Sequence, residues 1–258
     1  MEETSSGIRL NKFISDTGFC SRREADKLIE ANRVTINGKP VELGMRVQPG
    51  DIVAVDGKQV GAKKPAVYLA FNKPVGITCT TELHVKGNII SYINYKERIF
   101  PIGRLDKPSE GLIFLTNDGD IVNKILRAGN NHEKEYIVTV DKVIDDNFIR
   151  KMSSGVKILD TTTLPCKVFA EGKKRFRIIL TQGLNRQIRR MTEALGYEVE
   201  TLRRVRIMNI RLDDIPAGKW RFLTAHEMDE IHAMVAKSSK TEEASELRPI
   251  SGDDFNDE

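Results

Sequence analysis

The chain has 258 residues, of which 40% are hydrophobic and 30% are charged, and its formal net charge is +4. This length suits one large domain or a small domain beside a medium one, and no apolar run approaches the ~18 residues that a membrane span needs. The first residues contain no basic segment followed by an apolar core, so we expect neither a secretory signal nor a membrane partner.

The charge is divided unevenly along the chain. Residues 236–258 hold three basic and seven acidic side chains, a net charge of −4, so residues 1–235 carry +8. The last segment is rich in Ser, Asp and Glu and is predicted to be a disordered acidic tail. Because phosphates attract clustered Lys and Arg, the basic remainder indicates nucleic acid as the main partner.

The cysteines and histidines favour neither a disulfide framework nor a metal site. Cys20, Cys79 and Cys166 lie far apart without a Cys-x-x-Cys pair, so we expect free thiols in a reducing cytoplasm. The four histidines show no metal-ligand spacing, and we interpret them as surface residues.

A compact module is predicted over residues 8–61, after a flexible N-terminus at 1–7 and before a linker at 62–66. Ser21 and Glu24 have the Ser-x-x-Glu spacing of a capping box, which satisfies the first free amides of a helix. The module is expected to hold two helices followed by small strands: helices over 8–15 and from Ser21 to about Ala31, and strands over 34–36 and 52–55.

From residue 67 the pattern changes, and a second, larger domain is predicted over 67–235. Strands and helices interleave without regular alternation, so the predicted fold class is α+β with a mixed, largely antiparallel sheet. No Gly-rich phosphate loop is present. The strand-like runs are 67–71, 112–115, 136–140, 176–181 and 205–211, and the helix-like runs are 120–127, 145–152, 185–195 and 225–235.

Asp106 is the first candidate for chemistry. Gly-Arg-Leu-Asp at 103–106 precedes the apolar run 112–115, which is typical of a buried strand. A carboxylate at the mouth of a buried strand and close to an arginine is a common catalytic setting. A lone Asp more often caps a turn or pairs with arginine at the surface, so the rest of the chain must decide between these interpretations.

Four segments of the N-terminal module form a recognisable pattern: Arg-Leu-Asn-Lys-Phe-Ile at 9–14, Gly-Phe-Cys-Ser-Arg-Arg-Glu-Ala-Asp at 18–26, Val-Thr-Ile-Asn-Gly-Lys at 34–39 and Val-Gln-Pro-Gly-Asp at 47–51. The module resembles the small RNA-binding domain named after ribosomal protein S-four. In that family the second helix lies against structured RNA, and the contacts depend on shape and backbone charge. The resemblance implies that Ser21, Arg22, Arg23 and Lys27 meet phosphate; a solvated basic face is the alternative.

Further blocks lie in the larger domain: Asn-Lys-Pro-Val-Gly at 72–76, Gly-Arg-Leu-Asp at 103–106 with Gly-Leu-Ile-Phe-Leu-Thr-Asn-Asp-Gly-Asp at 111–120, His-Glu-Lys-Glu-Tyr at 132–136, and Gln-Gly-Leu-Asn-Arg-Gln-Ile-Arg-Arg-Met at 182–191. Together they resemble the catalytic domain of the pseudouridine synthases of the RsuA/RluB/RluE/RluF type. The segments 132–136 and 206–209 look most like the RluF branch, which acts on large-subunit (23S) ribosomal RNA.

The resemblance implies that a uridine in structured RNA is isomerised to pseudouridine. The N1–C1′ bond breaks and the base is rejoined through C5, so nothing is oxidised or lost and no cofactor or metal is expected. Asp106 is then the expected catalytic carboxylate, acting on the base or at C1′, and Arg189 the partner that keeps it charged. Tyr136 is expected to stack on the base, and its hydroxyl is a candidate acceptor of the C5 proton.

Several basic side chains are expected to contact the RNA. Arg104 would contact the backbone or fill the gap left by the extruded base. Arginines near the site would hold the surrounding phosphates: Arg186, Arg190, Arg203, Arg204 and Arg206. The three at 203–206 have a solvated strand face as their alternative. Lys134 and Glu135 flank Tyr136 and indicate that this strand end meets water.

Three alternatives remain open. The chain could be a non-catalytic RNA-binding protein acting in ribosome assembly, or a synthase acting on transfer RNA. An Asp-based glycoside hydrolase would need a second carboxylate and aromatic platforms, and aromatic residues make up only 6% of the chain. A monomer is expected, because no apolar helix stripe calls for a partner.

Overall fold

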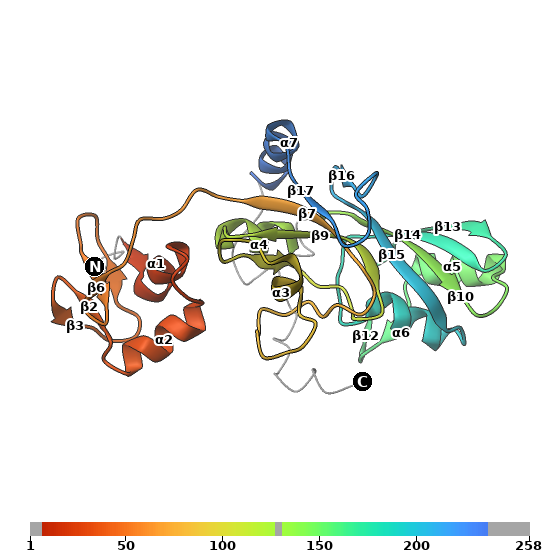
Figure 1. The fold of residues 1–258 in the computed structure, drawn as a ribbon. Helices are drawn as coiled ribbons and strands as arrows, with labels where there is room; N and C mark the ends of the chain where they lie inside the picture. The colour runs from red at the N-terminus through yellow and green to blue at the C-terminus, as the bar shows by residue number, and fades with distance from the viewer. Residues whose placement is uncertain (1–6, 127–130, 237–258) are drawn as a thin grey trace. The chain divides into compact units, whose positions relative to one another are not determined.

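The computed structural model describes residues 7–126 and 131–236 (Figure 1). The predicted flexible N-terminus and acidic tail lie outside these residues, apart from one residue of each. The chain divides into two compact units. The first holds the chain up to Val67 with Asn94–Phe100 and Thr116–Gly119, and the second holds Tyr68–Ile93, Pro101–Leu115 and the chain from Asp120. No described helix is long and apolar enough to cross a bilayer.

The N-terminal module is built on two short helices, α1 (Leu10–Asp16) and α2 (Arg22–Glu30), whose apolar faces share one core with strand valines. Its strands form a four-stranded sheet in the order β3-β2-β5-β6 and a two-stranded sheet of β1 and β4. The strands are β1 (Ile8–Arg9), β2 (Val34–Ile36), β3 (Lys39–Pro40), β4 (Arg46–Val47), β5 (Val53–Val55) and β6 (Lys58–Gln59).

The start of α2 confirms the predicted capping box. Ser21 Oγ accepts from the Glu24 N–H at 3.1 Å, and the Glu24 carboxylate accepts from the Ser21 N–H at 2.7 Å. The helix predicted over 8–15 is wrong at its start, because Ile8–Arg9 pairs with Arg46–Val47 and the helix begins at Leu10.

The second unit is organised by a nine-stranded sheet with the main order β13-β14-β10-β15-β9-β7-β17, in which β16 pairs with β15 and β8 with β9. The strands β13, β14, β10 and β15 are antiparallel neighbours, whereas β15 and β9 run parallel. The α+β class with a mixed, largely antiparallel sheet is therefore confirmed. The sheet strands are β7 (Tyr68–Lys73), β8 (Phe100–Ile102), β9 (Glu110–Thr116), β10 (Lys134–Val140), β13 (Lys167–Gly172), β14 (Arg175–Leu180), β15 (Val199–Ile207), β16 (Ile210–Arg211) and β17 (Trp220–Phe222).

Helices and one small hairpin complete this unit. They are α3 (Ile89–Ile93), α4 (Gly119–Leu126), α5 (Asp146–Ser154), α6 (Gln187–Ala194) and α7 (Ala225–Val235), with a hairpin of β11 (Lys157–Ile158) and β12 (Thr161–Thr162). Two apolar cores flank the centre of the sheet, one with α4 and α7 and the other with α5 and α6. Strand β15 contributes to both, Leu202 to one core and Ile207 to the other.

The strand predicted over 205–211 is wrong. Strand β15 begins at Val199, and the chain reverses after Ile207 to form β16. Met208 makes the reversal in a left-handed conformation (φ 53°) while its side chain stays in the core. A large apolar residue at positive φ is uncommon, so the composition alone favoured one continuous strand.

Strands β9 and β15 approach closely at Gly111. Gly111 pairs with Arg204 at φ 106°, and a Cβ at Gly111 would lie 2.3 Å from the Arg204 carbonyl oxygen. Only glycine permits this approach. The strand that follows the Asp106 loop is thereby held against the strand that carries Arg204.

Candidate active site

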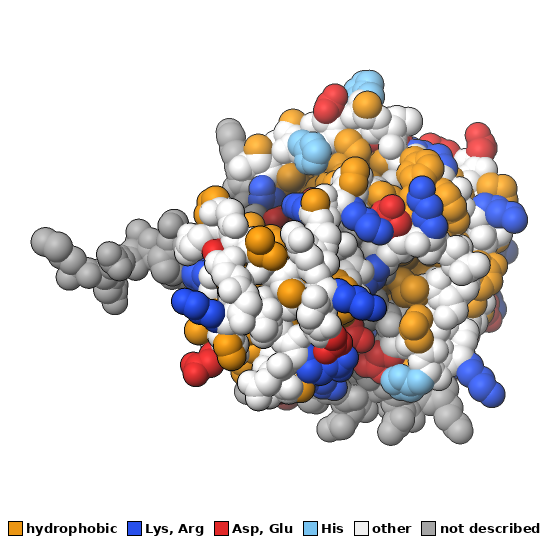
Figure 2. All heavy atoms as spheres, turned by 60° about the vertical axis from the view of Figure 1, so that its left-hand side comes forward, with side chains coloured by type: hydrophobic (Ala, Val, Ile, Leu, Met, Phe, Trp, Pro, Cys, Tyr) orange, Lys and Arg blue, Asp and Glu red, His pale blue; other side chains and the backbone are white. Residues whose placement is uncertain are grey.

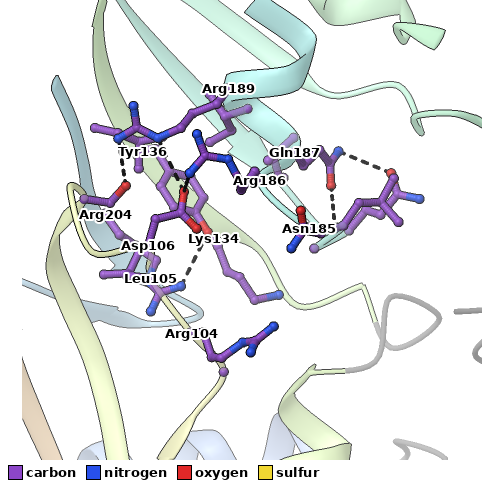
Figure 3. A pocket seen from close by; sticks show the side chains of 18 of the residues that line it. Arg104, Leu105, Asp106, Lys134, Tyr136, Asn185, Arg186, Gln187, Arg189 and Arg204 are labelled. Carbon is purple, nitrogen blue, oxygen red and sulfur yellow. Dashed lines mark hydrogen bonds and ion pairs between the residues drawn. The ribbon is translucent and has the colours of Figure 1, made fainter. Parts of the chain in front are cut away.

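A cavity of about 390 Å³ opens beside the central strands of the second unit (Figure 3). It is lined by the loop between β8 and β9, by β10 and β15, and by the segment that leads into α6. Asp106, Tyr136 and Arg189 all line it, although they are far apart in the sequence. The structure therefore brings the three predicted catalytic residues to one cavity.

A buried lysine stabilises the loop that carries Asp106. Lys73 is fully buried, and its ammonium donates to the Ser109 carbonyl at 2.7 Å and lies 3.4 Å from the Lys107 carbonyl. The Ser109 N–H closes a turn on the Asp106 carbonyl at 3.0 Å. Burial lowers the pKa of Lys73. A buried cation thus fixes the backbone on which the carboxylate sits.

Two guanidinium groups face the Asp106 carboxylate, which is 29% exposed. Arg189 Nε lies 3.4 Å and Arg186 Nη1 3.8 Å from Asp106 Oδ2, so both contacts are ion pairs. Arg189 also donates to Ser109 Oγ at 3.0 Å and to the Val199 carbonyl at 3.3 Å. Burial lowers the pKa of Arg189 and Asp106 raises it in part. The group stays a cation, because an arginine is not deprotonated in a protein.

Tyr136 presents a partly exposed ring to the cavity and is backed by Arg204. The Arg204 guanidinium lies 5.9 Å from the ring centroid, and its Nη1 is 3.5 Å from the phenol oxygen. Its Nε donates to the Leu112 carbonyl at 2.6 Å, and the residue is only 3% exposed. The expected phosphate contact by Arg204 is therefore wrong, because the side chain lies under Tyr136.

The other side of β10 carries a network of ion pairs. Glu135 is 4% exposed and pairs with Arg177 and, at 2.6 Å, with Arg206. Arg206 also reaches Glu133 at 2.9 Å. Burial would raise the pKa of Glu135, but the two arginines lower it below its usual range. Arg206 is thus engaged by carboxylates and is not a free phosphate ligand.

The prediction that this end of the strand meets water is also wrong. Lys134 is 7% exposed, Glu135 is 4% exposed, and His132, expected at the surface, is 8% exposed. The pairing of β10 with both β14 and β15 places Lys134 and Glu135 in the interior of the sheet. A sequence rich in charges gave no sign of this burial.

The segment before α6 is shaped by polar side chains. Gln187 is buried and accepts from the Leu184 N–H at 3.0 Å. Arg186 has a left-handed backbone (φ 47°), an arrangement that costs energy in a residue with a Cβ and is often found at binding sites. Arg190 donates to Asn185 at 3.0 Å, so this predicted RNA contact also braces the loop.

The remaining predicted RNA-contact residues lie at the surface. Arg22, Arg23 and Lys27 are exposed on α2, with Arg23 and Lys27 on the side opposite its buried residues, and Ser21 serves as the N-cap. Arg104 is exposed in the loop before Asp106. On the face drawn in Figure 2, Lys and Arg side chains are scattered over the surface, some of them beside Asp or Glu, and do not form one patch.

Arg204 was expected only as a phosphate contact, and three residues around the cavity were given no role there by sequence reasoning: Lys73, Ser109 and Lys134. Two signals were available for them. Lys73 and Ser109 lie within or next to the blocks that carry the family resemblance. Lys134 lies two residues before Tyr136 in the same block, a spacing that puts both side chains on one face of a strand.

Comparison with known proteins agrees with this arrangement. The family model for RNA pseudouridylate synthase matches residues 67–194, and that for the S4 domain matches residues 8–60. The chain therefore belongs to the RNA pseudouridylate synthase family, as an enzyme with an N-terminal S4 domain. It is 55% identical over 246 residues to the dual-specificity RNA pseudouridine synthase RluF of Escherichia coli (strain K12), covering 95% of this chain and 83% of that one.

Two further relatives extend the comparison. The ribosomal large subunit pseudouridine synthase B of Bacillus subtilis (strain 168) is 35% identical over 235 residues, covering 88% of this chain and 96% of that one. A crystal structure of a pseudouridylate synthase superposes with a TM-score of 0.65 at 27% identity, covering 87% of this chain and 99% of that one. The resemblance stated from the sequence blocks is thus confirmed for both domains.

Proposed function

We propose that this synthase isomerises a specific uridine in large-subunit (23S) ribosomal RNA, with Asp106 as the catalytic carboxylate. The observation that supports the role of Asp106 is its contact with Arg189, 3.4 Å away, in a cavity that Tyr136 also lines. Large-subunit RNA is favoured by the name of the Bacillus subtilis relative, which is a ribosomal large subunit pseudouridine synthase. A monomer that works in the cytoplasm, where ribosomes are found, completes the proposal.

In the proposed mechanism the target uridine leaves its stack and enters the cavity, at a cost of a few kcal/mol. Asp106 attacks the base or acts at C1′, the N1–C1′ bond breaks, the base turns, C5 bonds to C1′, Asp106 is released as a carboxylate, and N1 takes up a proton as C5 loses one. Tyr136 stacks on the base, and its hydroxyl is the candidate acceptor of the C5 proton. Arg189 holds the carboxylate in place, since a fixed geometry removes most of the entropic cost of the reaction.

RNA is held by charges outside the cavity in this proposal. Arg22, Arg23 and Lys27 on α2, with the N-cap Ser21, would bind phosphates of folded RNA. Near the cavity, Arg104, Arg186 and Arg190 would hold the backbone around the extruded nucleotide. Most of the RNA affinity would then be electrostatic and would fall with salt.

The test is to map pseudouridines in ribosomal RNA from cells that lack the gene, complemented with the wild type, Asp106→Ala or the control Asp146→Asn, an exposed carboxylate on α5. One ribosomal site should be lost and restored by the wild type and the control. Asp106→Ala should not restore it, although its RNA affinity should stay within about threefold, because an alanine removes only the reacting group. Restoration by Asp106→Ala would exclude Asp106 as the catalytic group.

A transfer RNA substrate is the second candidate. It is favoured by the name of the Escherichia coli relative, which states dual specificity. The same mapping, extended to transfer RNA, decides between one substrate class and two. An unchanged ribosomal pattern in cells that lack the gene would contradict the ribosomal assignment.

A further inference from the structure

Lys134 is a buried cation on the cavity side of β10. It stands two residues before Tyr136 on the same strand, so both side chains point to one face, and both line the cavity with Asp106 (Figure 3). Its closest acceptor is the His132 carbonyl at 3.4 Å, which is long for a hydrogen bond. No carboxylate within residues 7–126 and 131–236 forms an ion pair with it. An ammonium group offers three hydrogen-bond donors, so Lys134 can donate to further acceptors.

Arg204 brings a second cation to the same cavity. Its Nε is engaged by the Leu112 carbonyl, and its Nη1 lies at the outer limit of a bond to Tyr136. Its Nη2 is buried and has no acceptor in the described part of the chain. Arg204 also lines the cavity. Neighbouring strands thus place two cations at this cavity: Lys134, which has donors to spare, and Arg204, which lies behind the ring of Tyr136.

Burying the cations of Lys134 and Arg204 costs free energy when no ligand is bound. Burial lowers the pKa of Lys134 to about 8, and the charge of Arg204 acts in the same direction. Asp106 is the only carboxylate among the described residues that line the cavity, and Arg186 and Arg189 already face it. Apolar residues would be expected at such positions in a purely structural core. The excess of buried positive charge indicates a ligand with oxygen atoms or negative charge.

We propose that Lys134 binds a carbonyl oxygen of the target uracil, and that Lys134 and Arg204 together stabilise the negative charge that the ring carries during the reaction. This inference rests on the proposed function and adds a base-binding site to it. If Asp106 acts at C1′, the electron pair of the N1–C1′ bond stays on the ring and is shared with the carbonyl oxygens. If Asp106 adds to the base, the electrons move to the C4 carbonyl oxygen. In both routes the ring becomes neutral once C5 has bonded to C1′ and Asp106 has left as a carboxylate, and the C5 proton is then lost while N1 takes one up.

The same donors would select the base. Uracil has an acceptor oxygen at C4, whereas cytosine has an amino group there, which is itself a donor. A cytosine in the cavity would leave a buried cation facing a donor, which disfavours its binding. The site would therefore distinguish uridine from cytidine without a carboxylate or an amide side chain.

The test compares Lys134→Met with a control, Lys173→Met, which replaces an exposed lysine in the β13–β14 turn. Single-turnover rates are measured for pseudouridine formation on RNA with uridine, and for formation of the C5–C1′ bond on RNA with 5-fluorouridine, which has no C5 proton to lose, at the target position. Fluorine withdraws electrons and stabilises the detached ring without help from the protein. Lys134→Met should lower the uridine rate ~100-fold, as loss of a buried charge-stabilising donor does, and the 5-fluorouridine rate by less than about tenfold. RNA affinity should stay within about threefold of the wild type.

Thermal unfolding separates this role from a structural one. Because Lys134→Met removes a buried charge that has no carboxylate partner among the described residues, its Tm should be equal to or ~2–4 °C above that of the wild type. Arg204→Met removes the second charge, and its defect should also be smaller on 5-fluorouridine. An unchanged uridine rate in Lys134→Met, or an equal defect on both RNAs with a lower Tm, would overturn the inference. A wild type that forms no pseudouridine would instead contradict the proposed function.

Discussion

At the scale of single residues, the most informative side chain is Lys73, because it touches the loop of Asp106 and not the cavity. Charge-assisted hydrogen bonds to backbone carbonyls are stronger than neutral ones and hold a loop in one geometry. Lys73 therefore sets where the Asp106 carboxylate lies. Its contribution is to positioning, since other residues would contact the base.

Lys73→Met should lower the single-turnover rate by ~10–100-fold, because a displaced carboxylate reacts poorly. The free energy of unfolding should change by less than about 2 kcal/mol, since the lost hydrogen bonds are offset by removal of a buried charge. Lys157→Met, an exposed lysine of β11, is the control. A rate equal to that of the wild type would show that the loop holds its shape without the ammonium group.

The sequence predicted Asp106, Tyr136 and Arg189 as one group because each lies in a block of the family pattern, and all three line one cavity. The sequence failed for Lys134 and Glu135. It shows that both are charged, but solvent access depends on strands from elsewhere in the chain. Tertiary pairing of β10 decides that one faces the cavity and the other faces two arginines.

At the scale of elements, the junction of β9 with β15 depends on Gly111. Gly111→Ala would place a Cβ 2.3 Å from the Arg204 carbonyl oxygen at φ 106°. The free energy of unfolding should fall by about 2–4 kcal/mol, because either the strands separate or the backbone is strained. Urea denaturation measures this, with Gly61→Ala as the control, where no atom lies within 4 Å of the new methyl group. Equal midpoints for the two variants would contradict the close approach.

An ion pair at the start of helix α7 makes the stability of the protein depend on pH. Hydrogen bonds from Arg221 lower the pKa of Glu227 to about 2, burial opposes this, and the N–H of the cap residue Thr224 adds to it. A carboxylate with a lowered folded-state pKa contributes stability that is present above its unfolded pKa of about 4.3 and is lost as the pH falls toward the folded value. The contribution is roughly 1–3 kcal/mol at neutral pH, allowing for partial exposure.

Glu227→Gln should therefore be less stable than the wild type at neutral pH, and the difference should shrink between about pH 4.5 and pH 2. Thermal melts at both ends of this range measure it. A difference that stays constant with pH would mean that the effect of the substitution is not electrostatic.

Element positions were predictable where local signals were strong. The Ser21–Glu24 capping box located the start of α2, and the apolar run 112–115 located β9. The turn at Met208 was missed because its left-handed backbone is stabilised by core packing rather than by a turn-forming residue. The short strands β8 and β17 were missed as well, since three residues carry too little periodicity.

At the scale of the whole molecule, the exposed cations of α2 and the cavity that Asp106 lines belong to different parts of the chain. The S4 domain exposes Arg22, Arg23 and Lys27 on α2, whereas the synthase domain buries several of its cations. The order of the domains and the fold class followed from sequence blocks. The order of strands in the large sheet did not, because it arises from pairings between segments that are distant in sequence.

Replacing Arg22, Arg23 and Lys27 together by Gln should weaken RNA binding and reduce the slope of log K against log salt by about 2, at ~0.7–0.9 per phosphate contact. Filter binding at several salt concentrations measures this, with Lys58→Gln on β6 as the control. The rate of the chemical step at saturating RNA should not change. An unaltered salt slope would show that α2 does not face phosphate.

The side chains of β10 alternate between two faces of the strand, and this alternation limits which insertions and deletions the gene can tolerate. Lys134 and Tyr136 point into the cavity, and Glu135 between them meets Arg177 and Arg206. A point substitution alters one of these side chains. Loss of a single codon within the strand moves every residue that follows the deletion, within the strand, to the opposite face. A carboxylate would then meet the RNA base, and a phenol would lie among guanidinium groups. We therefore expect insertions and deletions to be tolerated in the connecting loops and to inactivate the enzyme within this strand.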